Sequence, residues 1–312
     1  MSILVTGSIA VDHIMVFRDR FRNHILPDKV HMLNVAFHVP SLRKSYGGCG
    51  ANIAYNLCQL GADPLLLGTV GQDFGAYAGW LDRHGVRRDH VLELADAYTA
   101  QAFITTDLDD NQITAFHPGA MDRAHEARLD GVADAVRVAI VSPNGKRAMQ
   151  EYAAELKTRD VELVVDPGQG LPMFERDELR ELIEGASLYV VNDYEWSLTR
   201  EKTGWDAEEI TARVGAVVVT RGERGSQILE KESVRDVAAV PAGAVVDPTG
   251  CGDAYRAGLL YGRAQGLDLD AACRIGSLMG ALKVSVEGPQ GLDLESGAFA
   301  ERYAAEFGRP LP

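Results

Sequence analysis

The sequence predicts an α/β protein in which helices cover both faces of a mostly parallel β-sheet, with a small β-sheet lid beside it. From residue 137 onward, short β-branched runs alternate with stretches of helical period, which is typical of consecutive strand–helix units. Before residue 120, two stretches lack a helical period and partly alternate apolar with polar residues. We expect these two stretches, about 15–45 and 97–118, to form the lid.

Length and composition fit one folded unit. The chain has 312 residues, of which 46% are hydrophobic and 24% charged, and it shows no repeat or linker. We therefore predict a single domain over 1–312 into which the lid segments are inserted. The net charge of −14 argues against nucleic acid or an anionic membrane surface as a partner.

The compartment is predicted from what the N-terminus and the cysteines look like. The first ten residues are apolar but have no basic leader, and no run approaches the ~20 apolar residues of a membrane span. The four cysteines show no metal-binding spacing. We expect free thiols and a cytoplasmic protein without a membrane partner.

The N-terminal third begins with a predicted buried strand at 3–6, whose end presents Ser8 and Asp12. Open α/β sheets bind ligands beyond the carboxyl ends of their strands, so Asp12 is a candidate ligand contact; a solvated loop carboxylate is the alternative. The segment 18–42 is predicted to form short strands outside the main sheet. Glycines at 47–50 lead into a helix that ends near Gly61 and carries Asn52, whose amide suits a polyol.

The middle of the chain contains a predicted strand at 65–70, a helix at 74–84 and a hairpin over 98–116. The hairpin turns at 109–111 and carries Phe103 and Phe116 on its two arms. Two aromatic rings near a cleft could sandwich a flat base, although packing within the lid would also explain them.

The remaining units repeat the strand–helix pattern, with polar residues at the strand ends. Predicted strands lie at 138–141, 162–165, 187–191 and 217–219, antiparallel edge strands at 227–229 and 234–240, and helices begin at 145, 175, 192, 254, 269 and 299. Gln169 follows one of these strands; it is a candidate contact, or else a surface amide.

A glycine-rich turn near the C-terminus carries a candidate anion-binding site and a candidate base. The apolar run 244–246 meets DPTGCGD at 247–253, which opens a predicted helix over 254–265. Backbone amides at a helix N-terminus bind anions, and the Thr249–Gly252 stretch is small enough to close around a phosphate. Asp253 beside such a site is a candidate base, although helix capping would also explain it.

Three motifs in order resemble the PfkB family of ribokinase-like carbohydrate and nucleoside kinases. GGxxxN at 47–52, NxxE at 192–195 and DPTGCGD at 247–253 resemble the family's signatures, and the resemblance covers essentially the whole chain. Segments such as TGSIAVDHIM, FITTDLDDNQITAFHPGAM and GDAYRAG are most similar to bacterial adenosine kinases within the family. Pro248, where many members carry threonine, is a mild departure.

The resemblance implies a three-layer αβα sandwich with a β-sheet lid and ATP-dependent phosphorylation of the 5′-hydroxyl of adenosine. Asp253 would be the general base, and the amides of Gly250, Cys251 and Gly252 would neutralise the γ-phosphoryl charge. The remaining implied contacts are Ser8, Asp12, Gly48, Asn52, Phe103, Phe116 and Gln169 for the nucleoside, Thr249, Asn192, Thr220, Gly222 and Gly225 for ATP, and Glu195 with Asn192 for Mg²⁺, mostly through water.

Several points stay open at this level. Related kinases often carry a K⁺ site near the anion-binding turn, and nothing in this sequence proves one. A sugar kinase, a broad nucleoside kinase and a non-catalytic nucleoside sensor are the alternatives to an adenosine kinase involved in purine salvage. The apolar lid strands could also pair two copies of the chain as a homodimer.

Overall fold

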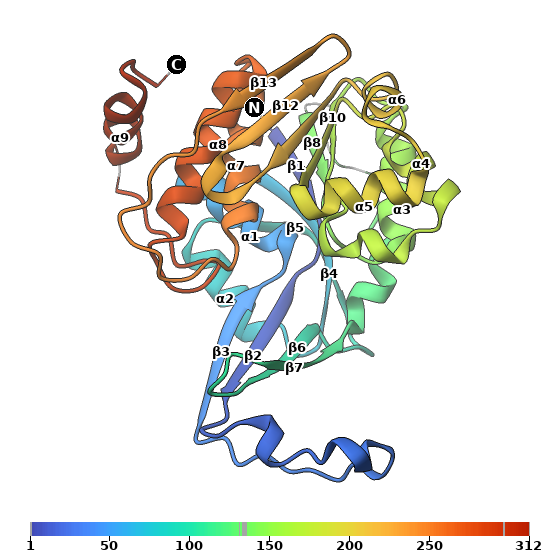
Figure 1. Cartoon of the computed structure of the whole chain (residues 1–312). Coiled ribbons are helices and arrows are strands. Elements are labelled where there is room, and N and C mark those ends of the chain that lie inside the picture. Colours follow the sequence, from blue (N-terminus) through green and yellow to red (C-terminus); the bar gives the residue numbers. More distant parts are fainter. Residues whose placement is uncertain (1, 131, 133–135, 296, 312) are drawn as a thin grey trace.

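A large, mostly parallel sheet organises the structure, a computed structural model that describes residues 2–130, 132, 136–295 and 297–311 (Figure 1). Its strand order is β13-β12-β11-β10-β9-β8-β1-β4-β5. The strands are β1 (Ser2–Thr6), β4 (Pro64–Gly71), β5 (Arg87–Leu94), β8 (Val136–Val141), β9 (Glu162–Val165), β10 (Leu188–Asn192), β11 (Ala216–Thr220), β12 (Ser226–Glu230) and β13 (Ser233–Val237). Pairing is parallel from β5 to β11, and β12 and β13 are antiparallel, as predicted.

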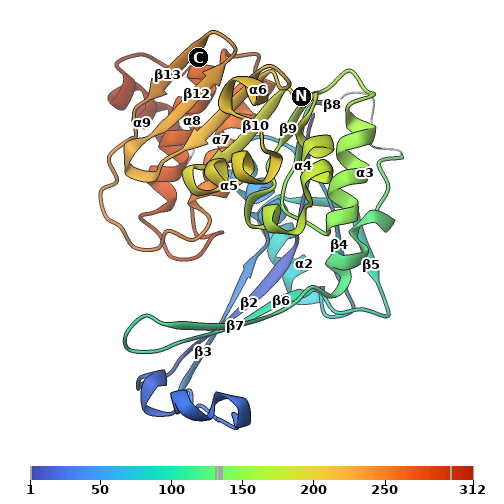
Figure 2. The ribbon, with the colours of Figure 1, turned by 45° about the vertical axis from the view of Figure 1, so that its right-hand side comes forward.

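Helices cover both faces of this sheet, because its central strands are apolar on both sides. One layer consists of α1 (Cys49–Gln59), α2 (Gly75–Arg83), α7 (Cys251–Ala264) and α8 (Leu269–Lys283), with α9 (Ala298–Phe307) packed outside α8. The other consists of α3 (Lys146–Leu156), α4 (Arg176–Ile183), α5 (Asp193–Thr203) and α6 (Ala207–Thr211). Figure 2 shows α3 and α4 apart from α7 and α8, and Figure 1 shows α5 grouped with α3 and α4.

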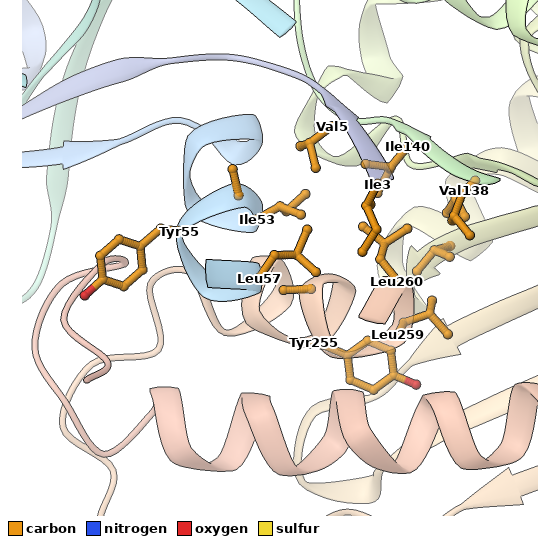
Figure 3. Close-up of a cluster of buried hydrophobic side chains, with 14 of the residues drawn as sticks. Ile3, Val5, Ile53, Tyr55, Leu57, Val138, Ile140, Tyr255, Leu259 and Leu260 are labelled. Carbon is orange, nitrogen blue, oxygen red and sulfur yellow. The ribbon is translucent and has the colours of Figure 1, made fainter. Parts of the chain in front are cut away.

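The core on the α1 and α7 side fixes the position of both helices. Figure 3 shows Ile3 of β1, Ile53 and Leu57 of α1, and Leu259 and Leu260 of α7 meeting in one cluster, and each is at most 1% exposed. Burying a side chain of this size contributes about 1.5–3 kcal/mol. The N-termini of α1 and α7 are therefore held rigidly beside each other at one end of the sheet.

The lid is a separate sheet of order β3-β2-β6-β7, which extends from the main body in Figure 1. Its strands are β2 (Ala10–Val16), β3 (Ser41–Gly47), β6 (Ala100–Thr106) and β7 (Gln112–His117). The predicted hairpin is confirmed by the antiparallel β6–β7 pair, and the Asp107 carboxylate accepts hydrogen bonds from the amides of Asp109 and Asn111 at its turn.

The strands predicted within 18–42 are wrong up to residue 40, and β3 begins at Ser41. This segment forms 3₁₀ turns at Phe21–Asn23 and Pro27–Met32, followed by irregular chain. Its aromatic residues pack on one another, with Phe17 and Phe21 both about 4.8–4.9 Å from the ring of Phe37, instead of alternating across a sheet. Pro27 and Pro40 also remove backbone donors that strand pairing needs.

The apolar run 244–246 is irregular chain, and Val245 is 78% exposed. Two further differences concern the bounds and the number of the elements. The helix predicted to begin at 254 begins at Cys251. Strand β5 and helix α6 were not predicted, because β5 carries four charged residues and α6 is only one turn long. No helix in the described part of the chain is long and apolar enough to span a membrane.

Candidate active site

A cavity of about 840 Å³ lies between the lid sheet and the carboxyl ends of the parallel strands. It brings together most residues that the sequence singled out. They are Ser8, Asp12, Gly48, Asn52, Phe116, Gln169, Asn192, Glu195, Thr220, Thr249, Gly250, Gly252 and Asp253.

A second cavity of about 540 Å³ adjoins the first. It is lined by Gly222, Gly225 and Cys251, and its apolar wall comes mainly from the 239–248 segment and α8. Thr220 and Gly252 line both cavities, so the two spaces meet at the N-terminus of α7. Such a pair of spaces can hold two ligands whose reacting groups meet at that helix end.

The α7 N-terminus presents unused backbone donors at this junction. Gly250 precedes the helix with φ +80°, and a Cβ there would lie 2.7 Å from Pro289 Cβ, so glycine is required. Within the described residues, the amides of Gly250, Gly252 and Asp253 have no hydrogen-bond acceptor. The Cys251 amide, which is also predicted to face the anion, donates to Pro248 O (3.2 Å) in this structure. Three free donors and the helix dipole remain to bind phosphate.

Asp253 lies in the first turn of α7, on the wall of the larger cavity. Its Oδ2 accepts a hydrogen bond from Asn52 Nδ2 on α1 (2.8 Å). Burial raises the pKa of the Asp253 carboxyl to about 6, against the opposing effects of Asn52 and the Arg256 guanidinium. A carboxylate with a pKa near 6 can accept a proton at neutral pH, which suits a general base.

A buried ion pair that the sequence reasoning missed supports this turn. Arg256 Nη2 donates to Asp166 Oδ1 (2.9 Å), its Nε donates to Asp166 Oδ2, and its Nη1 donates to Gly252 O (3.2 Å). The two side chains are 7% and 2% exposed. The available signals were an aspartate directly after a predicted strand and an arginine three residues, about one helical turn, after Asp253.

Asp12 lies on β2 of the lid sheet, not in a loop beyond β1. It lines the larger cavity, and burial raises the pKa of its carboxyl while neighbouring His13 opposes the rise. Among the described residues, neither of its carboxylate oxygens accepts a protein hydrogen bond. A partly buried acceptor of this kind suits ligand hydroxyl groups.

The two lid phenylalanines lie on opposite faces of the lid sheet. Phe116 pairs with Ala102, which pairs with Asp12, and all three line the cavity. Phe103 follows Ala102 on β6, and successive side chains of a strand point to opposite faces. Phe103 therefore points to the other face of the lid sheet, where its ring stacks on that of His13 with the ring centroids 4.7 Å apart. The structure thus does not bring Phe103 to the cavity.

The N-terminus of α1 forms another wall. Ser8 Oγ accepts a hydrogen bond from the Cys49 amide (3.0 Å), so this hydroxyl already has a structural partner. Gly48 has φ +92°, and a Cβ there would lie 2.5 Å from Ser8 O. Cys49 Sγ lies 3.3 Å from Gln169 Nε2, and burial raises the pKa of its thiol well above the usual range. The thiol is therefore protonated and not a nucleophile.

Asn192 and Glu195 cap α5 reciprocally. Asn192 Oδ1 accepts from the Glu195 amide (2.7 Å), and Glu195 Oε2 accepts from the Asn192 amide (2.8 Å). These bonds leave Glu195 Oε1 as the acceptor for a metal-bound water. Mg²⁺ keeps several waters and needs only one or two carboxylates besides substrate phosphates, so these residues fit that ion.

Other cavity residues had no signal strong enough to be found in the sequence. Thr114, Met121, Asn144 and Met173 line the larger cavity. Asn144 is 3% exposed, and its Nδ2 has no hydrogen-bond partner among the described residues, while its Oδ1 accepts from the Gly145 amide.

Comparison with known proteins identifies the class to which this fold and site belong. The model of the pfkB family of carbohydrate kinases matches residues 6–296, and the chain belongs to this family. A nucleoside kinase of Methanocaldococcus jannaschii is 33% identical over 262 residues, covering 82% of this chain and 85% of that protein.

Solved structures give the same relationship. The nucleoside kinase of Burkholderia thailandensis in complex with inosine is 45% identical, covers 99% of both chains and superposes with a TM-score of 0.88. The same kinase has also been solved with ADP and inosine, at 47% identity and a TM-score of 0.85, covering 99% of this chain and 97% of that chain. The adenosine kinase of Sinorhizobium meliloti, at 24% identity and a TM-score of 0.77 over 97% of this chain and 99% of that chain, shares the fold.

Proposed function

We propose that this protein transfers the γ-phosphoryl group of ATP to the 5′-hydroxyl of a purine nucleoside, with adenosine as one substrate. The observation that carries the proposal is the junction of two cavities at the α7 N-terminus. Gly250, Gly252 and Asp253, whose amides have no acceptor among the described residues, line the larger cavity there, and Gly252 lines the second cavity as well. Transfer between two bound ligands needs such a meeting point. The similarity to kinases that act on nucleosides supports the choice of substrate class.

The nucleoside would occupy the larger cavity. Asp12 would accept hydrogen bonds from the ribose hydroxyls, and Phe116 would stack on the base. Gln169 and Asn144 would meet the base edge. An amide side chain offers both a donor and an acceptor, so Gln169 could pair with the 6-amino group of adenosine or the 6-oxo group of inosine.

ATP would occupy the second cavity, with Thr220, Gly222 and Gly225 along its adenine and ribose. Its phosphates would reach the junction with the larger cavity, where Thr249 lies. Asp253 would take the proton from the 5′-hydroxyl of the nucleoside as the hydroxyl oxygen attacks the γ-phosphorus and ADP leaves. The amides of Gly250, Gly252 and Asp253 would stabilise the charge on the transferred group. Mg²⁺, held through water by Glu195, would neutralise phosphate charge.

A substrate panel tests this proposal. Adenosine, inosine, guanosine, ribose and fructose 6-phosphate are each supplied with ATP and Mg²⁺, and ADP release is coupled to a dehydrogenase signal. We expect turnover of adenosine or inosine to exceed that of ribose at least tenfold. Equal or faster turnover of ribose would favour the sugar kinase, and binding without ADP release would favour the sensor. Repeating the assay in K⁺ and in choline salts determines whether a monovalent cation is needed.

Two further parts of the proposal concern the cellular setting. Phosphorylation of free nucleosides would serve purine salvage in the cytoplasm. A homodimer would form through the outer face of the lid, where Phe103, Ile113 and Leu42 are 41%, 43% and 65% exposed. Sedimentation velocity of the wild-type protein and of Phe103→Asp tests this contact, and a monomer in both samples would exclude it.

A further inference from the structure

Gln290 is a buried polar residue that the proposed reaction does not use. It lies in the loop that connects α8 to α9 and is 5% exposed. Its amide is hydrogen-bonded to Asn52, which is in turn hydrogen-bonded to Asp253. A buried amide must satisfy its donors and acceptor, so the direction of each of its hydrogen bonds carries information.

Two neighbours fix the orientation of the Gln290 amide. Trp80 Nε1 lies 2.9 Å from Gln290 Oε1, and an indole nitrogen can only donate. Tyr77 OH donates to the Gly47 carbonyl (2.8 Å), so its oxygen is left to accept from Gln290 Nε2 (2.6 Å). Turning the amide over would place two donors against each other at Trp80.

The orientation of Gln290 then fixes that of Asn52. The second N–H of Gln290 Nε2 donates to Asn52 Oδ1 (3.0 Å). With its oxygen used in this way, Asn52 presents Nδ2 to Asp253 Oδ2 (2.8 Å). The reverse orientation would oppose two donors at Gln290 and two acceptors at Asp253.

We propose that Gln290 is a positioning residue, anchored by Trp80 and Tyr77, that holds the Asn52 amide so that it donates to the base Asp253. This inference rests on the proposed function, since it assigns a role relative to the base of that reaction. It also changes the role implied for Asn52, because both ends of its amide have protein partners and its share in binding ribose is secondary.

The chain of hydrogen bonds favours the ionised form of Asp253 and holds one carboxylate oxygen, which leaves the other to face the substrate. The other groups that act on this carboxylate are the Cys49 thiol on α1, Arg256 and the Cys251 thiol on α7, and Asp166 after β9. Among the described residues, the side chain of Gln290 is hydrogen-bonded to Trp80, Tyr77 and Asn52 and to none of these groups, so a change at Gln290 reaches Asp253 through Asn52.

A double-mutant cycle tests the proposal. We expect Gln290→Leu to move the acidic limb of kcat/KM upward by about one pH unit, because the carboxylate loses an oriented donor. At pH 6 this corresponds to a loss of kcat of about five- to sixfold, with the nucleoside KM changed less than about twofold. Asn52→Ala should give a similar or larger shift, and the double variant should equal Asn52→Ala alone.

Two other variants separate positioning from folding. Gln59→Leu removes a hydrogen bond to the Leu294 amide on the outer end of α1, and it should leave the pH profile unchanged. Trp80→Phe removes only one of the hydrogen bonds that hold Gln290, and it should move the acidic limb of kcat/KM upward by a smaller amount. If Gln290→Leu lowers thermal stability but keeps the wild-type acidic limb, or if its shift adds to that of Asn52→Ala, the proposal is overturned.

A measurement without turnover keeps this inference separate from the kinase proposal. The pKa of Asp253 can be followed by NMR of ¹³C-carboxyl-labelled aspartate in the ligand-free protein, with the signal assigned by its loss in Asp253→Asn. The upward shift in Gln290→Leu should appear there as well. A shift in a protein without kinase activity would support the hydrogen-bond chain and refute the function, whereas an unshifted signal in an active kinase would refute the chain alone.

Discussion

Asn52 Nδ2 donates to Asp253 Oδ2 over 2.8 Å, although the two residues are 201 positions apart in the chain. The contact joins the first turns of α1 and α7, the two helices that begin within the GGxxxN and DPTGCGD motifs. One residue from each of two separate sequence motifs thus takes part in a single hydrogen bond at the cavity wall.

Asp253→Asn should abolish the base while keeping the shape of the site. We expect kcat to fall by ~10²–10⁴, the usual contribution of general base catalysis, and nucleoside affinity to change little. Steady-state kinetics and calorimetry measure the two effects. Asp268→Asn, on the N-terminus of α8 and outside both cavities, is the matched control. Unchanged turnover in Asp253→Asn would remove this residue from the mechanism.

The raised pKa of Asp253 predicts the pH dependence. Burial raises this pKa to about 6, and the base acts only when ionised. We therefore expect kcat/KM to fall tenfold per unit as pH decreases below about 6 and to be flat above it. An acidic limb near pH 4 would mean that a carboxyl with an ordinary pKa controls the rate.

The raised pKa of Asp253 also predicts how the stability of the fold depends on pH. Because the folded state favours the protonated carboxyl, its contribution to stability is present below pH 4 and is lost as pH rises through about 6. Asp253→Asn removes this loss, so its melting temperature should exceed that of the wild type at pH 7.5 and match it at pH 3.5–4. An equal difference at both pH values would contradict the assigned pKa.

Asp12→Ala should act mainly on nucleoside binding. Its carboxylate accepts no protein hydrogen bond in the described structure and faces the cavity, so its loss removes ligand contacts and not fold contacts. We expect the nucleoside KM to rise about 10–100-fold, as for a charge-assisted hydrogen bond worth about 1.5–3 kcal/mol, with the KM for ATP nearly unchanged. Asp160→Ala, an exposed residue outside the cavity, serves as the control. A rise confined to the KM for ATP would place Asp12 elsewhere.

The two lid phenylalanines provide a matched pair. Phe116→Ala should raise the nucleoside KM roughly tenfold or more, because stacking on a base is worth about 1–3 kcal/mol. Phe103→Ala should leave it within about twofold, since Phe103 lies on the other face of the lid against His13. Equal effects of the two substitutions would contradict the register of β6 and β7 with respect to the ligand.

The buried pair Arg256–Asp166 should contribute strongly to the integrity of the site. Arg256→Met leaves Asp166 buried without its partner, so we expect a loss of about 3–5 kcal/mol in the free energy of unfolding. The double variant with Asp166→Leu should recover part of this loss. Urea unfolding measures both, with the exposed pair variant Arg302→Met as a control expected to change stability by less than about 0.5–1 kcal/mol. Similar losses in the two single variants would contradict the role of burial.

The sequence predicted the alternating strands and helices because their period and β-branched runs are local properties. It also predicted that Asp12, Asn52 and Asp253 share a site, since the carboxyl ends of parallel strands gather at one edge. It could not predict which face of the lid each phenylalanine occupies. That depends on strand register, and a slip of one residue reverses it.

The sequence also could not predict side-chain contacts between residues that lie far apart in the chain. Asp166 pairs with Arg256 across 90 positions, and Gln290 reaches Asn52 across 238, contacts that only the packed fold defines. The segment 18–42 was misassigned because its apolar residues form an aromatic cluster among themselves, and a cluster of this kind imitates partial alternation.

The central claim is that Asp253 activates the 5′-hydroxyl of a nucleoside for attack on ATP. The most direct test is to incubate the wild-type protein with ATP labelled at the γ-phosphorus, Mg²⁺ and adenosine or inosine, and to identify the labelled product. We predict a nucleoside 5′-monophosphate, with the corresponding 5′-deoxynucleoside binding as a competitive inhibitor and accepting no label. Label on the 5′-deoxynucleoside, or no labelled product from either nucleoside, would contradict the claim.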